Sequence, residues 1–364
     1  MPRPTRDAAR AREAFRSLLA TTKPLVEDRM RELFDARLAQ RGSVSPEVKT
    51  VIEVARDLTL RGGKRFRAAL LSSTYFGAKP RGAADVAVAG GVALEMLQSY
   101  LLVQDDWMDG DVERRGGPSA HVALAKRLGK GPLAPGQAGA VGAILASDLI
   151  WGLAVEALAT ARAPADVRAE AVTALISIHE DVAVGQVLDT LAKRPDVEKL
   201  HDLKTGSYTV RGPLALGAIL GGAPRATVKA LGAFAAPLGV AFQLRDDLLG
   251  VFGTEEESGR PAGSDLMAGK STSVLRFALP KLRGADKRAV SAVWKRRAPR
   301  TAVRRAIAAV ESTGAREVVE SRLAALCSDA EKRAAKLPLS DKAKDQLVGA
   351  SLAIRVGPGG REAR

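Results

Sequence analysis

Carboxylates crowd together at two places in this chain, each directly after a long apolar segment. The first group reads Asp105-Asp106-Trp107-Met108-Asp109, and the second reads Asp246-Asp247-Leu248-Leu249-Gly250. Carboxylates at the end of a buried helix repel one another and lose hydration. A bound cation relieves both costs, and ligands that are all oxygen atoms suit Mg²⁺. If the two groups face each other, they predict a metal-bridged site for a diphosphate.

The spacing of the first group separates its carboxylates into two sets. Residues four apart share a helix face, so Asp105 and Asp109 are expected to hold the same metal cluster. Asp106 points about 100° away and is expected to accept hydrogen bonds instead. The alternative is an exposed acidic helix end, which is unfavourable because acidic side chains oppose the dipole at a helix C-terminus. In the second group Gly250 holds the fourth position, so that side offers fewer ligands.

Four short cationic segments accompany these carboxylates. They are Gly62-Gly63-Lys64-Arg65-Phe66-Arg67, Arg114-Arg115, Lys204-Thr205-Gly206 and Gly269-Lys270-Ser271-Thr272. Lysine and arginine supply charge-assisted hydrogen bonds to phosphates. The first segment lacks the spacing of a P-loop and, taken alone, is equally consistent with a solvated turn. Together, four cationic segments and two acidic groups predict a site that binds diphosphates.

The composition favours an all-α fold. Of the 364 residues 46% are hydrophobic and only 4% aromatic, and strong helix formers dominate. The patterns predict helices within 1–45 and over 86–104, 136–162, 165–195, 225–250, 272–285, 300–335 and 340–355. We expect one domain over residues 1–355 and a disordered tail over 356–364. The longest apolar runs are about 13 residues, fewer than the ~20 that a membrane span needs, so no transmembrane segment is predicted.

The net charge of +15 allows several partners. It favours attraction of anionic diphosphates or of an anionic membrane surface, or it is simply a solvated basic surface. Nucleic acid is not expected as a partner, because no recognition motif accompanies the charge. Cys327 is the only cysteine, which excludes an internal disulfide and predicts a reducing, cytoplasmic location. His121, His179 and His201 lack zinc-ligand spacing.

These ordered motifs, from about Gly62 to Thr272, resemble the trans-isoprenyl diphosphate synthases, also called polyprenyl synthetases. The run from Phe242 to Gly253 is most similar to bacterial short-chain geranylgeranyl diphosphate synthases. The resemblance implies a single large helical bundle around a deep central cavity. It also implies a homodimer, with transient membrane-surface contact expected during product release. The implied activity is Mg²⁺-dependent condensation of isopentenyl diphosphate with an allylic diphosphate.

By the same resemblance, each site residue receives a role. Asp105 and Asp109 would bind two Mg²⁺ ions and Asp246 a third. The allylic diphosphate would lie among Arg114, Lys204 and Lys270, with Thr205 and Gln243 near the developing cation. Isopentenyl diphosphate would bind Lys64, Arg67, Gln98 and Arg115 without metal. Three positions differ from many members of the family: Ala68 replaces Pro, Gln104 replaces His, and Gly250 replaces the last Asp of the second motif.

Product length is predicted from Tyr100 and Leu101. Tyr100 lies five residues before Asp105, about 7–8 Å along a helix, where its ring would close the floor of the cavity. This arrangement resembles that of C20 producers and predicts geranylgeranyl diphosphate, whereas a Tyr100 that only packs between helices would set no length. The alternatives are a farnesyl diphosphate (C15) synthase, a class I terpene cyclase and a non-catalytic synthase subunit. Lys64, Arg67 and Arg115 argue against a cyclase, which needs no isopentenyl site.

Overall fold

The computed structural model describes residues 6–192, 196–258, 261–294 and 302–355. Within these ranges almost all regular structure is helical, as the composition predicts. The predicted disordered tail, 356–364, lies outside the described residues. One domain over 1–355 stays a prediction.

The elements alternate long helices with short connections. The first half contains α1 (Arg6–Arg41), α2 (Pro46–Leu60), α3 (Phe66–Ala78), α4 (Ala84–Asp109), α5 (Ala120–Leu128), α6 (Pro135–Ala159) and α7 (Ala165–Leu191). Two short antiparallel strands, β1 (Glu113–Arg114) and β2 (Gly117–Pro118), connect α4 to α5. The second half contains α8 (Val197–His201), a π-helix η1 (Asp202–Arg211), α9 (Gly212–Leu220), α10 (Arg225–Phe252), α11 (Glu255–Ser258), α12 (Ser264–Ala268), α13 (Ser273–Ala278), α14 (Gly284–Trp294), α15 (Val303–Glu311), α16 (Ala315–Ala334) and α17 (Asp341–Ile354).

Local sequence signals fix several helix ends, but two predicted helices are divided. Ser45 caps α2, where its Oγ accepts a hydrogen bond from the backbone N–H of Val48 at 3.2 Å. The helix predicted over 300–335 is interrupted between α15 and α16, where Gly314 has a φ of +72° that favours glycine. The helix predicted over 272–285 ends at Ala278, and α14 begins at Gly284.

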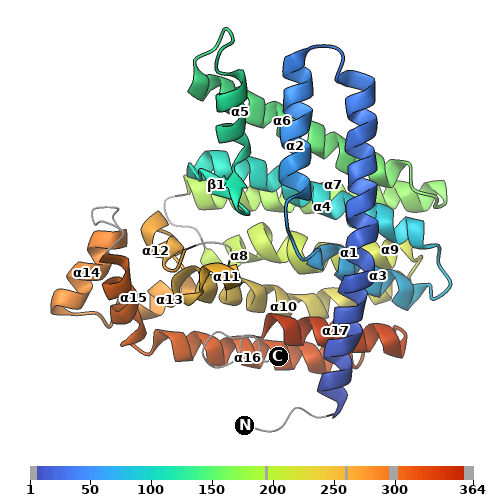
Figure 1. Cartoon of the computed structure of the whole chain (residues 1–364). Helices are drawn as coiled ribbons and strands as arrows, with labels where there is room; N and C mark the ends of the chain where they lie inside the picture. Colours follow the sequence, from blue (N-terminus) through green and yellow to red (C-terminus); the bar gives the residue numbers. More distant parts are fainter. Residues whose placement is uncertain (1–5, 193–195, 259–260, 295–301, 356–364) are drawn as a thin grey trace.

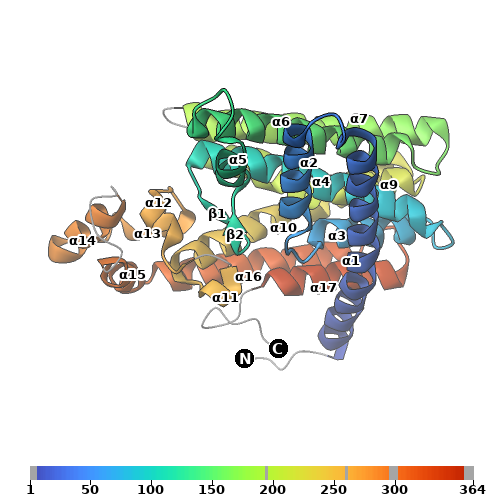
Figure 2. The same ribbon diagram turned by 45° about the horizontal axis from the view of Figure 1, so that its top comes forward.

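The helices stack in layers, with α4 and α10 in the interior (Figure 1). In Figure 2, α6 and α7 form the outermost layer, followed by α4, then α10, and finally α16 and α17 on the opposite side. The long helix α1 crosses these layers and packs against α2, α3, α4 and α17. This arrangement encloses α4 and α10, the two helices that carry the acidic groups.

Helix α4 is buried along most of its length, as its apolar sequence predicts. It ends where Gly110 adopts a left-handed conformation with a φ of +70°. The chain then turns away into β1 and β2. Asp105 and Asp109 therefore lie in the last turn of a helix that is anchored in the core, so their positions are fixed by its packing.

Four helices are long and apolar enough to cross a membrane, judged by length and composition alone: α4, α6, α7 and α10. A few polar residues interrupt their apolar runs, so counting uninterrupted runs did not identify them. In α4, 67% of the most apolar window is buried inside the protein, whereas the share in α7 is only 28%. The absence of a transmembrane segment therefore stays a prediction.

Close contact between α3 and α9 depends on Gly217. A Cβ atom at this position would overlap Thr74 Oγ1 and the carbonyl oxygen of Leu71. We expect Gly217→Ala to lower the free energy of unfolding by about 1–3 kcal/mol, because the backbones would have to separate. Urea denaturation measures the change.

Gly232 in α10 provides the matched control, since nothing lies within 4 Å of a Cβ there. Gly232→Ala should raise the free energy of unfolding, by up to about 1 kcal/mol, through helix propensity alone. Equal effects of the two substitutions would show that the α3–α9 contact is not tight.

Candidate functional site

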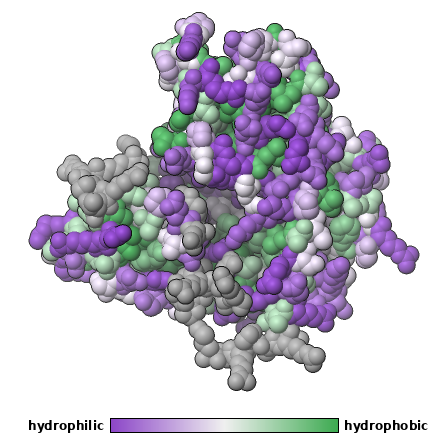
Figure 3. Space-filling view, viewed as in Figure 1, coloured by the Kyte–Doolittle hydropathy of each residue, from purple (hydrophilic) through white to green (hydrophobic). Residues whose placement is uncertain are grey.

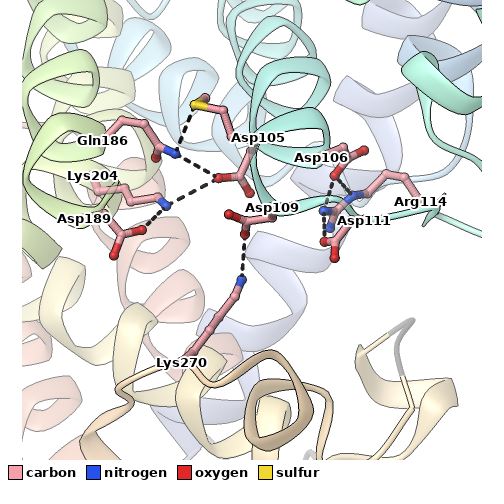
Figure 4. A network of polar contacts seen from close by, with 10 residues as sticks. Asp105, Asp106, Asp109, Asp111, Arg114, Gln186, Asp189, Lys204 and Lys270 are labelled. Atoms are coloured by element: carbon pink, nitrogen blue, oxygen red, sulfur yellow. Dashed lines mark hydrogen bonds and ion pairs between the residues drawn. The ribbon is translucent and has the colours of Figure 1, made fainter. Parts of the chain in front are cut away.

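Two lysines from distant elements meet the first acidic group. Lys204 Nζ lies 3.4 Å from Asp105 Oδ1, and Lys270 Nζ lies 3.3 Å from Asp109 Oδ2 (Figure 4). Burial tends to raise the pKa of Asp105, but the positive charges of Lys204 and Lys270 outweigh this effect and lower it. Asp105 is therefore held as a carboxylate. The two lysines occupy positions where cations neutralise the group.

Lys204 is placed by the π-helix η1, which the sequence patterns did not reveal. The helix lies so close to α7 that a Cβ on Gly185 would lie 2.6 Å from the backbone nitrogen of Lys204. Lys204 Nζ also lies 2.5 Å from Asp189 Oδ2, and the Gln186 side chain approaches Asp105 Oδ1 at 3.5 Å. Burial tends to lower the pKa of Lys204, and Asp105 and Asp189 together raise it. Asp189 and Gln186 are site residues that the sequence analysis missed.

Lys270 belongs to a turn that connects the two acidic groups. Its backbone carbonyl accepts a hydrogen bond from the Trp294 indole nitrogen at 3.3 Å. Three residues later, the backbone N–H of Ser273 donates to Asp247 Oδ2 at 2.7 Å. Because Lys270 contacts Asp109 while Ser273 holds Asp247, the segment between α12 and α13 lies against both groups. This segment therefore physically connects the two acidic motifs.

In the second group, Asp247 is the buried member. It is 3% exposed and also accepts a hydrogen bond from Gln243 Nε2 at 2.8 Å. Burial raises the pKa of Asp247 to about 6, although the hydrogen bonds from Ser273 and Gln243 oppose this shift. Asp246 is half-buried. These positions leave Asp246 as the more accessible carboxylate, which agrees with its predicted role.

Gly250 makes room for a carboxylate from another helix. A Cβ at position 250 would overlap Asp265 Oδ2, and Asp265 in α12 is only 5% exposed. The space beside Gly250, where a third aspartate side chain would lie, is therefore occupied by the Asp265 carboxylate. Packing requires glycine there, and no motif in the sequence pointed to Asp265.

Asp106 faces away from the lysines, as its helical angle predicts. It is fully buried and accepts hydrogen bonds from Arg114 Nε, at 2.7 Å, and from Arg114 Nη2. Arg114 also contacts Asp111. Figure 4 shows this cluster turned away from Lys204 and Asp105. Arg114, expected beside the allylic diphosphate, is thus engaged by two carboxylates.

The glycine turn before α3 lies against the β1–β2 connection. Arg61 donates to the carbonyl of Arg114 at 3.1 Å, and Arg115 donates to the carbonyl of Arg61 at 3.0 Å. Burial, together with the positive charge of Arg65, lowers the pKa of Arg115 to about 10, and Glu95 opposes this shift. The shift shows that burial and the neighbouring arginines destabilise the charged form of Arg115. A bound anion would restabilise that charged form.

Arg67 and Lys64 flank this arginine cluster. Arg67 is 7% exposed, donates to Thr209 Oγ1 at 2.9 Å and lies over the Tyr208 ring at 4.3 Å. Lys64 is exposed. In the part of the chain that the structure describes, neither Lys64, Arg67 nor Arg115 forms an ion pair with a carboxylate. These three cations stand apart from the carboxylate–lysine site, and their binding of isopentenyl diphosphate stays a prediction.

Arg65, the third cation of the glycine turn, points into the core instead. It is 2% exposed, and its guanidinium bonds Glu27 at 2.9 Å, Glu95 at 3.2 Å and the carbonyl of Thr59 at 3.1 Å. Its backbone has a φ of +52°, which is rare for a residue with a side chain. These buried ion pairs attach the glycine turn to α1, through Glu27, and to α4, through Glu95. Arg65 therefore positions Lys64 and Arg67 rather than binding an anion.

A cavity of about 90 Å³, partly open to solvent, lies along α4 between Asp105 and Tyr100. Its lining includes Tyr100, Leu101, Asp105, His179, Lys204 and Tyr208. At the end away from Asp105, Tyr100 Oη lies 3.1 Å from His179 Nε2, and His179 stacks on Trp151 with ring centroids 4.5 Å apart. Burial lowers the pKa of His179, so the ring is neutral near pH 7. His179 thus lines the cavity beside Tyr100, and Trp151 packs against both rings; the sequence analysis had considered Tyr100 alone.

The donor set of the carboxylate site fits Mg²⁺. The accessible ligands are carboxylate oxygens, and the lysine contacts show where positive charge is accommodated. No group of three or more potential metal ligands converges at one point among the described residues. This too fits Mg²⁺, which usually binds one or two protein carboxylates and completes its shell with water and substrate phosphates.

Among the residues that the structure describes, two expected site residues have no hydrogen-bond partner that would define a role. Gln98 on α4 and Thr205 on η1 are both half-buried. Gln98 lies two helical turns before Asp105 and three residues after Glu95. Their predicted contacts with substrate stay predictions.

Comparisons with known proteins agree with this geometry. The family model described as polyprenyl synthetase matches residues 48–310. The chain is 30% identical, over 69% of its length and 74% of the relative's, to a short chain isoprenyl diphosphate synthase of Methanocaldococcus jannaschii. It is 34% identical, over 58% of its length and 69% of the relative's, to a farnesyl diphosphate synthase of Geobacillus stearothermophilus.

A solved structure is also similar over nearly the whole fold. It is a geranylgeranyl pyrophosphate synthase from Corynebacterium glutamicum, complexed with isoprenyl diphosphate and magnesium. The TM-score is 0.86 at 28% identity, covering 93% of this chain and 99% of the other. The likeness includes the helical bundle that surrounds the two acidic groups.

Proposed function

This chain belongs to the polyprenyl synthetase family and is a trans-prenyltransferase, and we propose that its product is geranylgeranyl diphosphate. The observation that carries the proposal is the cavity beside Asp105, where Tyr100 and His179 line a floor and Trp151 packs against both of their rings. The names of its relatives include both farnesyl and geranylgeranyl synthases, so product length rests on this floor.

The two cationic regions provide separate places for two diphosphates. We assign the allylic diphosphate to the carboxylate–lysine site and isopentenyl diphosphate to Lys64, Arg67 and Arg115. Asp105, Asp109 and Asp246 would hold Mg²⁺, which supplies charge neutralisation to the leaving diphosphate when bound. Lys204 and Lys270 would add positive charge at the same place.

The chain's own residues then favour ionisation followed by condensation. The C1–O bond of the allylic diphosphate breaks, and both electrons leave with the diphosphate. The double bond of isopentenyl diphosphate attacks the resulting cation, and a proton is lost to the departing diphosphate, so no protein base is required. Thr205 and Gln243 are assigned to the surroundings of the cation. The apolar cavity below Asp105 excludes water that would otherwise capture the cation.

A product assay tests the function directly. Purified protein receives labelled isopentenyl diphosphate with dimethylallyl, geranyl or farnesyl diphosphate, in Mg²⁺ or in EDTA. We expect C20 product in Mg²⁺ only, and a loss of at least about 100-fold in Asp105→Asn because charge stabilisation is removed. Glu113→Gln, an exposed carboxylate on β1, is the matched control and should retain activity. No elongation with any primer would favour a cyclase or a non-catalytic subunit.

Product length should follow the size of the side chain at position 100. Tyr100→Ala opens the cavity toward His179 and Trp151, so products longer than C20 are expected, detected by chromatography of the dephosphorylated alcohols. Tyr100→Phe keeps the ring but removes its hydrogen bond to His179, and it should keep the C20 product. Leu101→Ala should change length less, because the side chain is smaller. An unchanged product in Tyr100→Ala would remove Tyr100 from the floor.

We also propose that the chain is a homodimer that uses the outer face of α6 and α7. Apolar side chains are exposed at helical spacing on both helices: Val141, Ile144, Leu145 and Leu149 on α6, and Ile176, Val184, Val187 and Leu191 on α7. The two helices lie side by side in Figure 2. A contiguous apolar patch of this kind is typical of an interface between subunits. The cytoplasmic location stays a prediction.

The subunit interface is tested by Leu145→Asp with Val187→Asp. Each substitution places a charge in the proposed interface, so sedimentation velocity should show the mass of one chain rather than two. Val318→Asp, at an exposed apolar residue on α16, is the control and should stay dimeric. A dimer that survives both interface substitutions would place the contact elsewhere.

A further inference from the structure

The positive charge of the chain is concentrated in one segment. Residues 271–310 contain eleven lysines and arginines and a single acidic residue, Asp286, which gives a net charge of +10. The whole chain carries +15, so the remaining residues together contribute only +5. A basic surface that simply reflects composition would be spread along the sequence. Of these eleven cations, seven lie among the described residues, on α13, α14, α15 and the connection between α13 and α14.

These elements form a lobe at one end of the molecule (Figure 1). We call α13, α14 and α15 the basic lobe. Its described cations include Lys281, Arg283, Lys287, Arg288, Arg304 and Arg305, and all six are exposed. None of the six forms an ion pair with a carboxylate among the described residues. The end of the molecule where α14 and α15 lie is markedly hydrophilic on the face shown in Figure 3.

The positions of several of these cations are unfavourable for helix stability. Lys287 and Arg288 follow closely on the start of α14, and Arg304 and Arg305 lie in the first turn of α15. Positive side chains near a helix N-terminus oppose the helix dipole. Helix formation therefore does not explain them. An external anionic partner does, because it compensates for their mutual repulsion.

The lobe is joined directly to the carboxylate–lysine site. Trp294, the last residue of α14, donates its indole N–H to the carbonyl of Lys270, and Ser273 at the start of α13 holds Asp247. Phe277 on α13 is 37% exposed and follows the exposed Arg276. An aromatic side chain beside cations matches a surface with negative headgroups above an apolar layer.

We propose that the basic lobe docks this enzyme on an anionic lipid membrane surface, beside the site that makes the amphiphilic product. The inference rests on the proposed function, because the reaction converts soluble diphosphates into a product with a long hydrocarbon tail. That tail favours a bilayer over water, so docking beside a bilayer shortens the path of release. A nucleic acid has no such relation to the reaction.

The test measures binding of the full chain, without substrate, to vesicles of phosphatidylcholine alone or mixed with phosphatidylglycerol. We expect co-sedimentation only with the anionic vesicles, weakening as salt is raised, since screening shortens the reach of exposed charges. Each basic residue near an anionic surface raises membrane partitioning about fivefold. Lys287→Glu, Arg288→Glu, Arg304→Glu and Arg305→Glu combined should therefore reduce binding by more than about 100-fold.

A control with the same change in net charge separates the lobe from overall charge. Arg225→Glu, Lys229→Glu, Lys336→Glu and Lys342→Glu combined replace four exposed cations outside the lobe. This variant should lose less than about 10-fold in binding. Equal losses in the two variants would overturn the proposal, and so would equal binding to neutral vesicles. Stronger binding of the lobe to a random DNA duplex than to anionic vesicles would also overturn it.

Turnover distinguishes failure of docking from failure of the proposed function. Without vesicles, both variants should match the unaltered chain, because none of these residues is placed in the site. With anionic vesicles, turnover should rise in the unaltered chain and in the control but not in the lobe variant. Binding without any elongation would refute the proposed function and leave the docking surface standing. A lobe variant that raises KM for both substrates without vesicles, and binds vesicles normally, would show that the lobe attracts substrate instead.

Discussion

The site depends on keeping Asp105 ionised near the end of a buried helix. Burial opposes this, and the positive charges of Lys204 and Lys270 compensate for it. Each lysine is delivered by a different part of the chain, one by the π-helix η1 and the other by the α12–α13 turn. In the proposed reaction, the same two lysines would add positive charge beside the leaving diphosphate.

Buried ion pairs of Arg65 hold the glycine turn beside the cations Lys64, Arg67 and Arg115. Arg65 is held between Glu27 and Glu95, which connects α1 to α4 through the glycine turn. Removing one member of such a pair leaves an uncompensated buried charge, typically at a cost of about 3–5 kcal/mol. The turn that carries Lys64 and Arg67 is therefore rigid although it contains two glycines. Glu95 lies on the helix that also presents Asp105, so the glycine turn and the carboxylate–lysine site are both held by α4.

Charge is divided among three regions with different tasks. At the carboxylate–lysine site, opposite charges pair with each other. Around Arg115, positive charges cluster in a partly buried position. In the basic lobe, positive charges are exposed to solvent. The lobe touches the first region through Trp294 and Lys270. Because of this contact, docking of the lobe at an anionic surface and binding at the carboxylate–lysine site can influence each other.

The sequence by itself determined the helical class, the two acidic motifs and the angle that turns Asp106 away from Asp105 and Asp109. These properties follow from local rules of spacing and helix geometry, and they need no knowledge of what packs where. Local rules also explain why α2 begins at its Ser45 cap, and they predicted that α4 is buried. They did not place the break at Gly314, because short helices and turns depend on what surrounds them.

Only the tertiary structure decided which residues meet across long sequence distances. Asp189, Gln186, Asp265, His179 and Trp151 belong to no motif, yet packing brings each beside a predicted residue. Arg65 received no role from the sequence, and the structure shows it buried against two glutamates. Ion pairs and close helix contacts of this kind depend on folded distances, which the spacing of residues along one chain does not encode.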